Sequence, residues 1–184
     1  LQDQPTVALI RGDGELLWSI TDDIRAESHA TITRAHFDTD SLTYIYYTPA
    51  NQATVFDDHH LLVDIDINTK VRSEIELDDL HHDITPLPDG GIAYLSKEWR
   101  TISGAEVSGD TIVELTPHGD INIIWSAWDH LDFDDAVISS GTGNWSHANV
   151  LNFSESSNEY TIGLRNLSAI VRVDRATGET RGIF

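Results

Sequence analysis

Two kinds of predicted β-hairpin alternate along this sequence, and their alternation leaves few folds open to it. In the first kind, an alternating apolar strand is followed by a turn and a second strand, over 6–20, 61–77, 111–126 and 169–184. Hairpins of the second kind lie between these, each opening with a histidine, over 29–47, 82–96 and 147–164. Apolar residues at every second position are typical of half-buried strands, and Gly, Pro, Asp and Asn between the strands favour turns. The sequence therefore predicts an all-β fold.

One hairpin of each kind supplies four antiparallel strands, which is the make-up of a β-propeller blade. The chain then consists of a half blade over 1–20 and blades over about 28–77, 81–126 and 146–184. This repeat is longer than the roughly 40 to 50 residues of common propeller repeats, and we assign the extra length to loops over 49–60, 98–109 and 128–145. No helix is expected beyond a turn or two within 129–137.

A β-sandwich is the alternative architecture, but it does not require one unit to recur with a fixed opening residue. About three and a half blades cannot close a ring and would leave open sheet edges. We therefore expect a single, partial propeller domain whose two ends lie inside a longer protein.

The charge balance excludes some classes of partner. Acidic residues number 31 against 11 basic ones, for a net charge of −20. Nucleic acid and anionic membrane surfaces would be repelled by such a chain, and no stretch approaches the roughly 18 apolar residues of a membrane span. Adaptation to high salt is the leading interpretation of the charge, and an ordinary acidic surface is the alternative. Since cysteine is absent, disulfides and thiolate sites are excluded.

Histidines at matching positions of the repeat are the candidate functional residues. The first strand of each blade lines the channel of a propeller, so His29, His82 and His147 are predicted to surround one axis. A strand period of two would place Asn149 on the same face as His147. Arg165 ends the partner strand and is expected to return beside His147. Imidazoles, an amide and a guanidinium together would suit a tetrahedral oxyanion.

Several of these segments resemble the arylsulfotransferase family. The resemblance is clearest over about 80–184 and weak before that, and it is carried by WSHAN at 145–149, GLRNLSAI at 163–170, VDRATGE at 173–179, WSAWDHL at 125–131, and HHDI with LPDGG at 81–84 and 87–91. The resemblance implies a six-bladed propeller that transfers a sulfuryl group from an aryl sulfate ester to a phenol through a sulfated histidine. It also implies an extracytoplasmic protein that uses no nucleotide sulfate donor, and we expect no cofactor. No signal peptide is visible in the sequence.

The resemblance assigns roles to individual residues. His147, Arg165 and His82 correspond by position to catalytic channel residues of the family. We further expect Asn149, Asn166 and His29 to bind substrate. The nucleophilic histidine is expected in a later blade, beyond Phe184.

Two other functions remain open at this stage. A non-catalytic cell-surface propeller, acting as a binding or scaffold module, could keep the same histidines. A metal-dependent enzyme is the third possibility, since three imidazoles around one axis could hold zinc or copper. No metal ligands are assigned.

Overall fold

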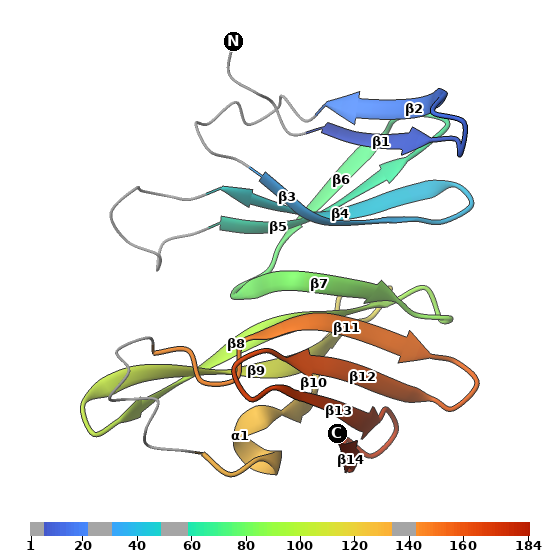
Figure 1. Cartoon of the computed structure of the whole chain (residues 1–184). Coiled ribbons are helices and arrows are strands. Elements are labelled where there is room, and N and C mark those ends of the chain that lie inside the picture. Colours follow the sequence, from blue (N-terminus) through green and yellow to red (C-terminus); the bar gives the residue numbers. More distant parts are fainter. Residues whose placement is uncertain (1–5, 22–30, 49–58, 134–142) are drawn as a thin grey trace. The chain divides into compact units, whose positions relative to one another are not determined.

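The computed structural model describes residues 6–21, 31–48, 59–133 and 143–184, and nearly all of the regular structure there is β-strand (Figure 1). The chain divides into two compact units, Leu1–Asp78 and Asp79–Phe184. The helix found among the described residues is a single turn, α1 (Ala127–His130), which Ser126 caps through its side chain. In the described ranges no helix has the length and apolar character needed to cross a membrane.

The first unit holds a two-stranded hairpin and a four-stranded sheet. The hairpin pairs β1 (Thr6–Ile10) with β2 (Leu16–Thr21). The sheet follows chain order through β3 (Thr31–Phe37), β4 (Ser41–Thr48), β5 (His59–Asp66) and β6 (Arg72–Glu76). Its apolar core joins Val7 of the hairpin to residues of β4 and β5 that are almost fully buried, and Trp18 meets Phe37 edge-on.

The second unit consists of two four-stranded antiparallel sheets, each running in chain order. The first sheet contains β7 (Leu80–Pro86), β8 (Ile92–Ile102), β9 (Ala105–Leu115) and β10 (Ile121–Ser126). The second contains β11 (Ala148–Ser154), β12 (Glu159–Leu164), β13 (Ala169–Asp174) and β14 (Thr180–Ile183). In Figure 1 β7 lies beside β11, and Asp83 of β7 accepts a hydrogen bond from the backbone N–H of Leu151 at 2.8 Å.

One continuous apolar core joins the two sheets of the second unit. It takes residues from β8 and β9 on one side and from β11, β12 and β13 on the other. Trp125 and Trp145 are its largest members and are 1% and 0% exposed. Full burial of a large apolar side chain contributes about 1.5 to 3 kcal/mol, so packing between sheets is a major source of stability here.

The prediction of an all-β fold made of four-stranded blades is confirmed, with three such sheets and one two-stranded hairpin among the described residues. Each sheet is a simple meander, in which consecutive strands are neighbours, as a propeller blade requires. The breaks predicted from Gly and Pro also fall between strands, for example at 87–91 between β7 and β8.

The loop expected over 98–109 is wrong. In the structure β8 and β9 continue through this segment as one long hairpin, with Glu98 paired to Gly109 and Ile102 to Ala105. Ser103 and Gly104 both have positive φ, at 52° and 82°, which gives the tight two-residue turn that matches strand twist. The polar residues of this segment interrupt the apolar alternation by which a strand is recognised in a sequence.

Candidate functional site

The two histidines of the second unit that are predicted to line a channel share an uncommon backbone conformation. His82 and His147 have φ of 52° and 49°, in the left-handed region that non-glycine residues rarely occupy. In both places the ladder then shifts register, between His81 and Ile84 in β7 and between Ala148 and Val150 in β11. A bulge changes the direction in which nearby side chains point. The same combination of a left-handed histidine and a bulge therefore recurs near the start of β7 and of β11.

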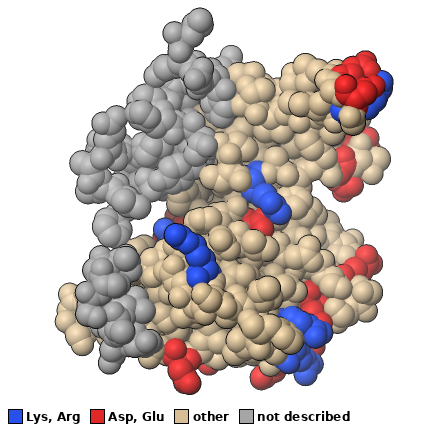
Figure 2. Space-filling model, viewed as in Figure 1, with Lys and Arg blue, Asp and Glu red and all other residues tan. Residues whose placement is uncertain are grey.

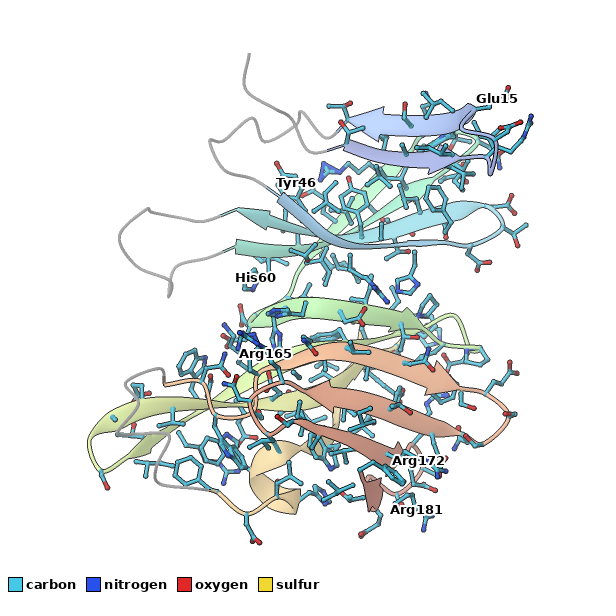
Figure 3. The ribbon with its side chains drawn as sticks, viewed as in Figure 1. Glu15, Tyr46, His60, Arg165, Arg172 and Arg181 are labelled. Atoms are coloured by element: carbon cyan, nitrogen blue, oxygen red, sulfur yellow. The ribbon has the colours of Figure 1, made fainter. Side chains whose placement is uncertain are left out.

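Pairing of β11 with β12 brings Arg165 to His147. The backbone N–H of Arg165 donates to the His147 carbonyl at 3.0 Å, and Nη1 of Arg165 lies 3.3 Å from Nε2 of His147. Figure 3 shows Arg165 at this end of the sheet and Arg172 and Arg181 toward the other. The latter two are paired with Glu159 and Asp174.

Arg165 has no carboxylate partner within the described part of the chain, although acidic residues outnumber basic ones there. Its side chain is exposed, as a ligand-binding guanidinium must be. The face drawn in Figure 2 shows few basic side chains, with acidic ones mainly at its margin. A free guanidinium beside an imidazole is therefore a local exception on an acidic molecule.

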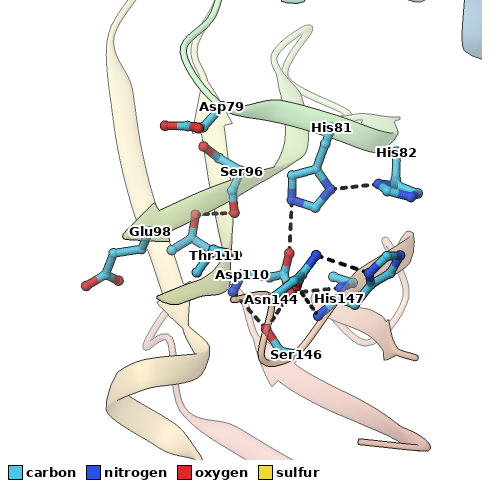
Figure 4. A network of polar contacts seen from close by, with 12 residues as sticks. Asp79, His81, His82, Ser96, Glu98, Asp110, Thr111, Asn144, Ser146 and His147 are labelled. Carbon is cyan, nitrogen blue, oxygen red and sulfur yellow. Dashed lines mark hydrogen bonds and ion pairs between the residues drawn. The ribbon is translucent and has the colours of Figure 1, made fainter. Parts of the chain in front are cut away.

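His82 completes a row of three imidazoles. Its ring lies 5.3 Å from that of His147, centroid to centroid. On its other side, Nδ1 of His82 is 3.0 Å from Nδ1 of His81, as Figure 4 shows. His82 is exposed, whereas His81 is buried.

Two donors meet the ring of His147. Oδ1 of Asn144 accepts the backbone N–H of His147 at 3.1 Å, so its amide nitrogen must face Nδ1 of His147, also at 3.1 Å. Nη1 of Arg165 faces Nε2 on the other side of the ring. An amide nitrogen and a guanidinium only donate, and a neutral imidazole accepts at one nitrogen, so the ring can accept from Asn144 or from Arg165. The guanidinium N–H groups that His147 does not use can donate to an oxyanion.

Asp110 of β9 lies at the centre of the polar network in Figure 4. One carboxylate oxygen lies 3.0 Å from Nε2 of His81, at ion-pair distance but off the line of the ring N–H. The other accepts from the Ser146 hydroxyl and, at 2.8 Å, from the backbone N–H of Ala148. The backbone N–H of Asp110 in turn donates to Ser146 Oγ at 2.9 Å. Asp110 thus joins the histidines of β7 to the start of β11.

The segment before β11 is held against β9 by main-chain bonds. Ser108 donates to the Gly143 carbonyl at 2.7 Å and accepts from the backbone N–H of Trp145 at 2.8 Å. Asn166 donates from its side chain to the Asn144 carbonyl at 2.8 Å. These bonds fix the stretch that carries Asn144, Ser146 and His147.

The surroundings of His82 and His147 lower the pKa of both side chains and so favour neutral imidazoles. Loss of solvent, helped by the charges of His81 and His147, lowers the pKa of His82 to about 4. The pKa of His147 is also lowered, first by loss of solvent and then by the charge of Arg165. Burial acts to raise the pKa of Asp110, but contacts with His81, Ser146 and the Ala148 N–H outweigh it and lower the pKa overall. Asp110 is therefore an ionised carboxylate that is 2% exposed.

The other predicted site residues are placed less simply. Asn149 lies in the bulge of β11 and is exposed, so the period-two argument that aligned it with His147 fails there. No hydrogen bond joins Asn149 to His147 or Arg165 in the described ranges. Asn166 contacts the Asn144 carbonyl. His29 lies outside the described residues. Within the ranges that the structure covers, no three His, Asp or Glu side chains are arranged to hold a metal ion.

Sequence reasoning missed three residues of this cluster: His81, Asp110 and Asn144. The doubled histidine at 81–82 was a visible signal, because two adjacent histidines can place one ring behind the other. Nothing in the spacing of Asp110 or Asn144 along the chain indicates that they meet the histidines.

Comparison with known proteins gives one family. A family model described as arylsulfotransferase (ASST) matches residues 2–183. None of the curated proteins matches the sequence. Among solved structures, hydrazine synthase of Kuenenia stuttgartiensis is similar in fold, with a TM-score of 0.55 at 14% identity, and the match covers 95% of this chain. The chain spans about half of that protein, 47% of its length.

Proposed function

The chain belongs to the arylsulfotransferase family, and we propose on that premise that it serves transfer of a sulfuryl group from an aryl sulfate ester to a phenol. His147, Arg165 and His82 are the residues proposed to act on the transferred group. No cofactor is needed for this reaction, and family membership favours an extracytoplasmic location.

The observation that carries this proposal is the exposed guanidinium of Arg165, which lies 3.3 Å from the imidazole of His147. A sulfuryl group presents negatively charged oxygens in a tetrahedral arrangement, and a guanidinium binds such a group through parallel N–H donors. The contacts of the His147 ring with Arg165 and Asn144 hold the guanidinium and the imidazole side by side before a substrate arrives. Preorganised donors of this kind are a large source of transition-state stabilisation.

The reaction takes place in two steps. An imidazole nitrogen attacks sulfur, the bond between sulfur and the aryl oxygen breaks, and a phenolate leaves. The oxygen of the accepting phenol then attacks sulfur, the nitrogen–sulfur bond breaks, and the phenolic proton passes to a base. A covalent intermediate divides one difficult transfer into two easier ones. We place the nucleophilic histidine in a later blade, beyond Phe184, and assign oxyanion binding to Arg165 and His147.

The remaining predicted residues receive supporting roles. Asn166 holds the main chain that carries His147, through its bond to the Asn144 carbonyl. Asn149 and His29 are proposed to contact the aryl groups of donor or acceptor. His82, which is exposed beside His147, is proposed to face the reacting oxygen.

The test uses the full-length protein in high salt with a chromogenic aryl sulfate, with and without phenol. Phenol-dependent release of the chromophore, together with a sulfuryl group on a histidine in mass spectra, is the expected result. Arg165→Ala should lower kcat/KM by about 10²- to 10³-fold. Arg172→Ala is the matched control, because Arg172 is paired with Glu159 toward the other end of the same sheet, and it should retain activity.

Absence of release and label from a folded protein would contradict the transferase proposal. The exposed guanidinium beside His147 would then identify a binding module for sulfated or other oxyanionic ligands. Loss of aryl sulfate binding in Arg165→Ala, with binding retained in Arg172→Ala, would separate that function from a purely structural role.

A further inference from the structure

Asp110, His81 and His82 form a continuous row from a buried carboxylate to an exposed imidazole. Nε2 of His81 is 3.0 Å from Asp110 Oδ1, and Nδ1 of His81 is 3.0 Å from Nδ1 of His82. His81 is 8% exposed and Asp110 is 2% exposed. Neither buried residue can reach a substrate, so any part they play in the reaction passes through His82.

The contacts determine where hydrogens can sit. The carboxylate of Asp110, 3.0 Å from Nε2 of His81, attracts an N–H and repels a lone pair, so Nε2 carries a hydrogen although the N–H does not point straight at the carboxylate. Nδ1 of neutral His81 is then a lone pair, and the hydrogen between the two rings belongs to Nδ1 of His82. Nε2 of His82 is left as a free lone pair at the exposed edge of the ring.

We propose that Asp110 and His81 are positioning residues which hold His82 with a bare Nε2 and make it the proton acceptor of the site. In the second step of the proposed reaction, on which this assignment of the proton rests, the phenolic proton moves to His82 Nε2. The hydrogen on His82 Nδ1 passes to Nδ1 of His81, and the phenolate oxygen forms its bond to sulfur as the bond between sulfur and the nucleophilic nitrogen breaks. The resulting imidazolium is His81, which Asp110 stabilises as an ion pair.

In this row the exposed ring receives the proton and the buried ring holds the charge. An isolated His82 would have to hold a positive charge after losing solvent and near Lys97, and both disfavour it. Lys97 on β8 and His147 lower the pKa of His82, while Asp110 on β9 acts to raise it. Arg165 and Lys97 likewise lower the pKa of His147. Moving the charge onto His81 places it next to the buried carboxylate of Asp110.

The tautomer of His82 is measured first, by long-range ¹H–¹⁵N correlation NMR on ¹⁵N-histidine-labelled protein near pH 7.5. Wild type should show His82 protonated at Nδ1. In Asp110→Asn and His81→Phe this preference should be lost, because each change removes one of the two contacts that impose it, Asp110 with His81 or His81 with His82. An unchanged His82 tautomer in both variants would overturn the proposal.

The matched control is Glu114→Gln. Glu114 lies four residues along the same strand and also joins β9 to the second sheet, through Tyr160 and Arg175. This variant should lose stability without changing the His82 tautomer. A similar loss of tautomer preference in Glu114→Gln would show that the effect follows general loosening of the interface, and would overturn the proposal.

Kinetics then tests the proton-accepting role. In Asp110→Asn, kcat for the phenol-dependent step should fall about 10²-fold, KM for phenol should change little, and the acidic limb of the pH profile should shift to lower pH. Asp110→Glu should restore part of the rate. An unchanged pH profile with lowered thermal stability alone would overturn the catalytic part. If the protein has the expected His82 tautomer but no transferase activity, the positioning role of Asp110 and His81 would stand and the proposed function would be refuted.

Discussion

Two buried carboxylates on β9, Asp110 and Glu114, join the same pair of sheets but have different kinds of partner. Glu114 accepts from Tyr160 at 2.5 Å and from Arg175 at 2.8 Å, and Arg175 also binds Asp89. Arginine keeps its charge at any ordinary pH, so this end of the strand is a fixed clamp. Asp110 instead meets His81, Ser146 and a backbone N–H. His81 is an imidazole, which unlike a guanidinium has a neutral form, so this end can exchange a proton.

The difference shows how one strand can carry both stability and chemistry. Residues four apart on a strand project from the same face, so both carboxylates point at the second sheet. The two carboxylates differ only in their partners: Glu114 is held by an arginine that keeps its charge, and Asp110 lies beside an imidazole that can exchange a proton. The comparison predicts that damage at the Glu114 end should be mainly thermodynamic, and that damage at the Asp110 end should alter function as well.

The largest expected loss of stability follows Arg175→Ala. This change leaves Glu114 buried without its cation, and breaking a buried pair costs about 3 kcal/mol. Chemical denaturation should show the loss, whereas the His82 tautomer should stay as in wild type. Unchanged stability would mean that the Glu114–Arg175 pair contributes little, and it would contradict the assignment of the Glu114 end of β9 to stability.

Ser146→Ala should weaken the other end by about 1 to 2 kcal/mol, because it removes a hydroxyl that bonds both the carboxylate and the N–H of Asp110. Here transfer activity should fall together with stability, since Ser146 immediately precedes His147 and its bonds to Asp110 hold that stretch in place. Stability that falls with activity intact would place Asp110 in the same class as Glu114.

Tyr160→Phe should cost about 1 kcal/mol and leave activity unchanged, because only the hydroxyl bond to Glu114 is lost. The measurement is the denaturation midpoint of the variant beside that of Ser146→Ala. A loss of phenol-dependent rate in Tyr160→Phe would show that the two ends are coupled.

The smallest effect is in the pH dependence of stability. The pKa of His82 is lowered to about 4 in the folded chain, so the unfolded chain binds more protons between about pH 6.5 and 4. Stability should therefore fall as pH falls through that window, and His82→Gln should flatten the fall. The effect is modest because His82 is exposed.

The Glu114 end should respond at the opposite extreme of pH. Burial, and then the bond to Glu114, raises the pKa of Tyr160 above its ordinary value. Its contribution to stability is thus present below about pH 10 and lost above it. The free energy of unfolding, measured in acid and in alkali, should report on the His82 end and the Glu114 end separately. A free energy of unfolding that stays constant in wild type between about pH 6.5 and 4 would contradict the assignment to His82.

Local patterns in the sequence were sufficient for the blades and for one contact of the site. Alternation and turn residues predicted the hairpins, and antiparallel return predicted that Arg165 meets His147. The hairpin of β8 and β9 was missed because Lys97, Glu98 and Arg100 interrupt the apolar alternation. Asp110 and Asn144 could not be found this way, since their places depend on main-chain bonds from Ser108 to the 143–145 segment and on bulges that no spacing encodes.

The left-handed backbone at His82 and His147 has a consequence for protein engineering. Each non-glycine residue held in that conformation costs on the order of 1 kcal/mol, and glycine or asparagine would adopt it more readily. A search for heat-resistant variants that scored melting temperature alone would favour replacing these two histidines. Such a search would remove the residues proposed to handle the sulfuryl group, so selection for function and selection for stability oppose each other at these positions.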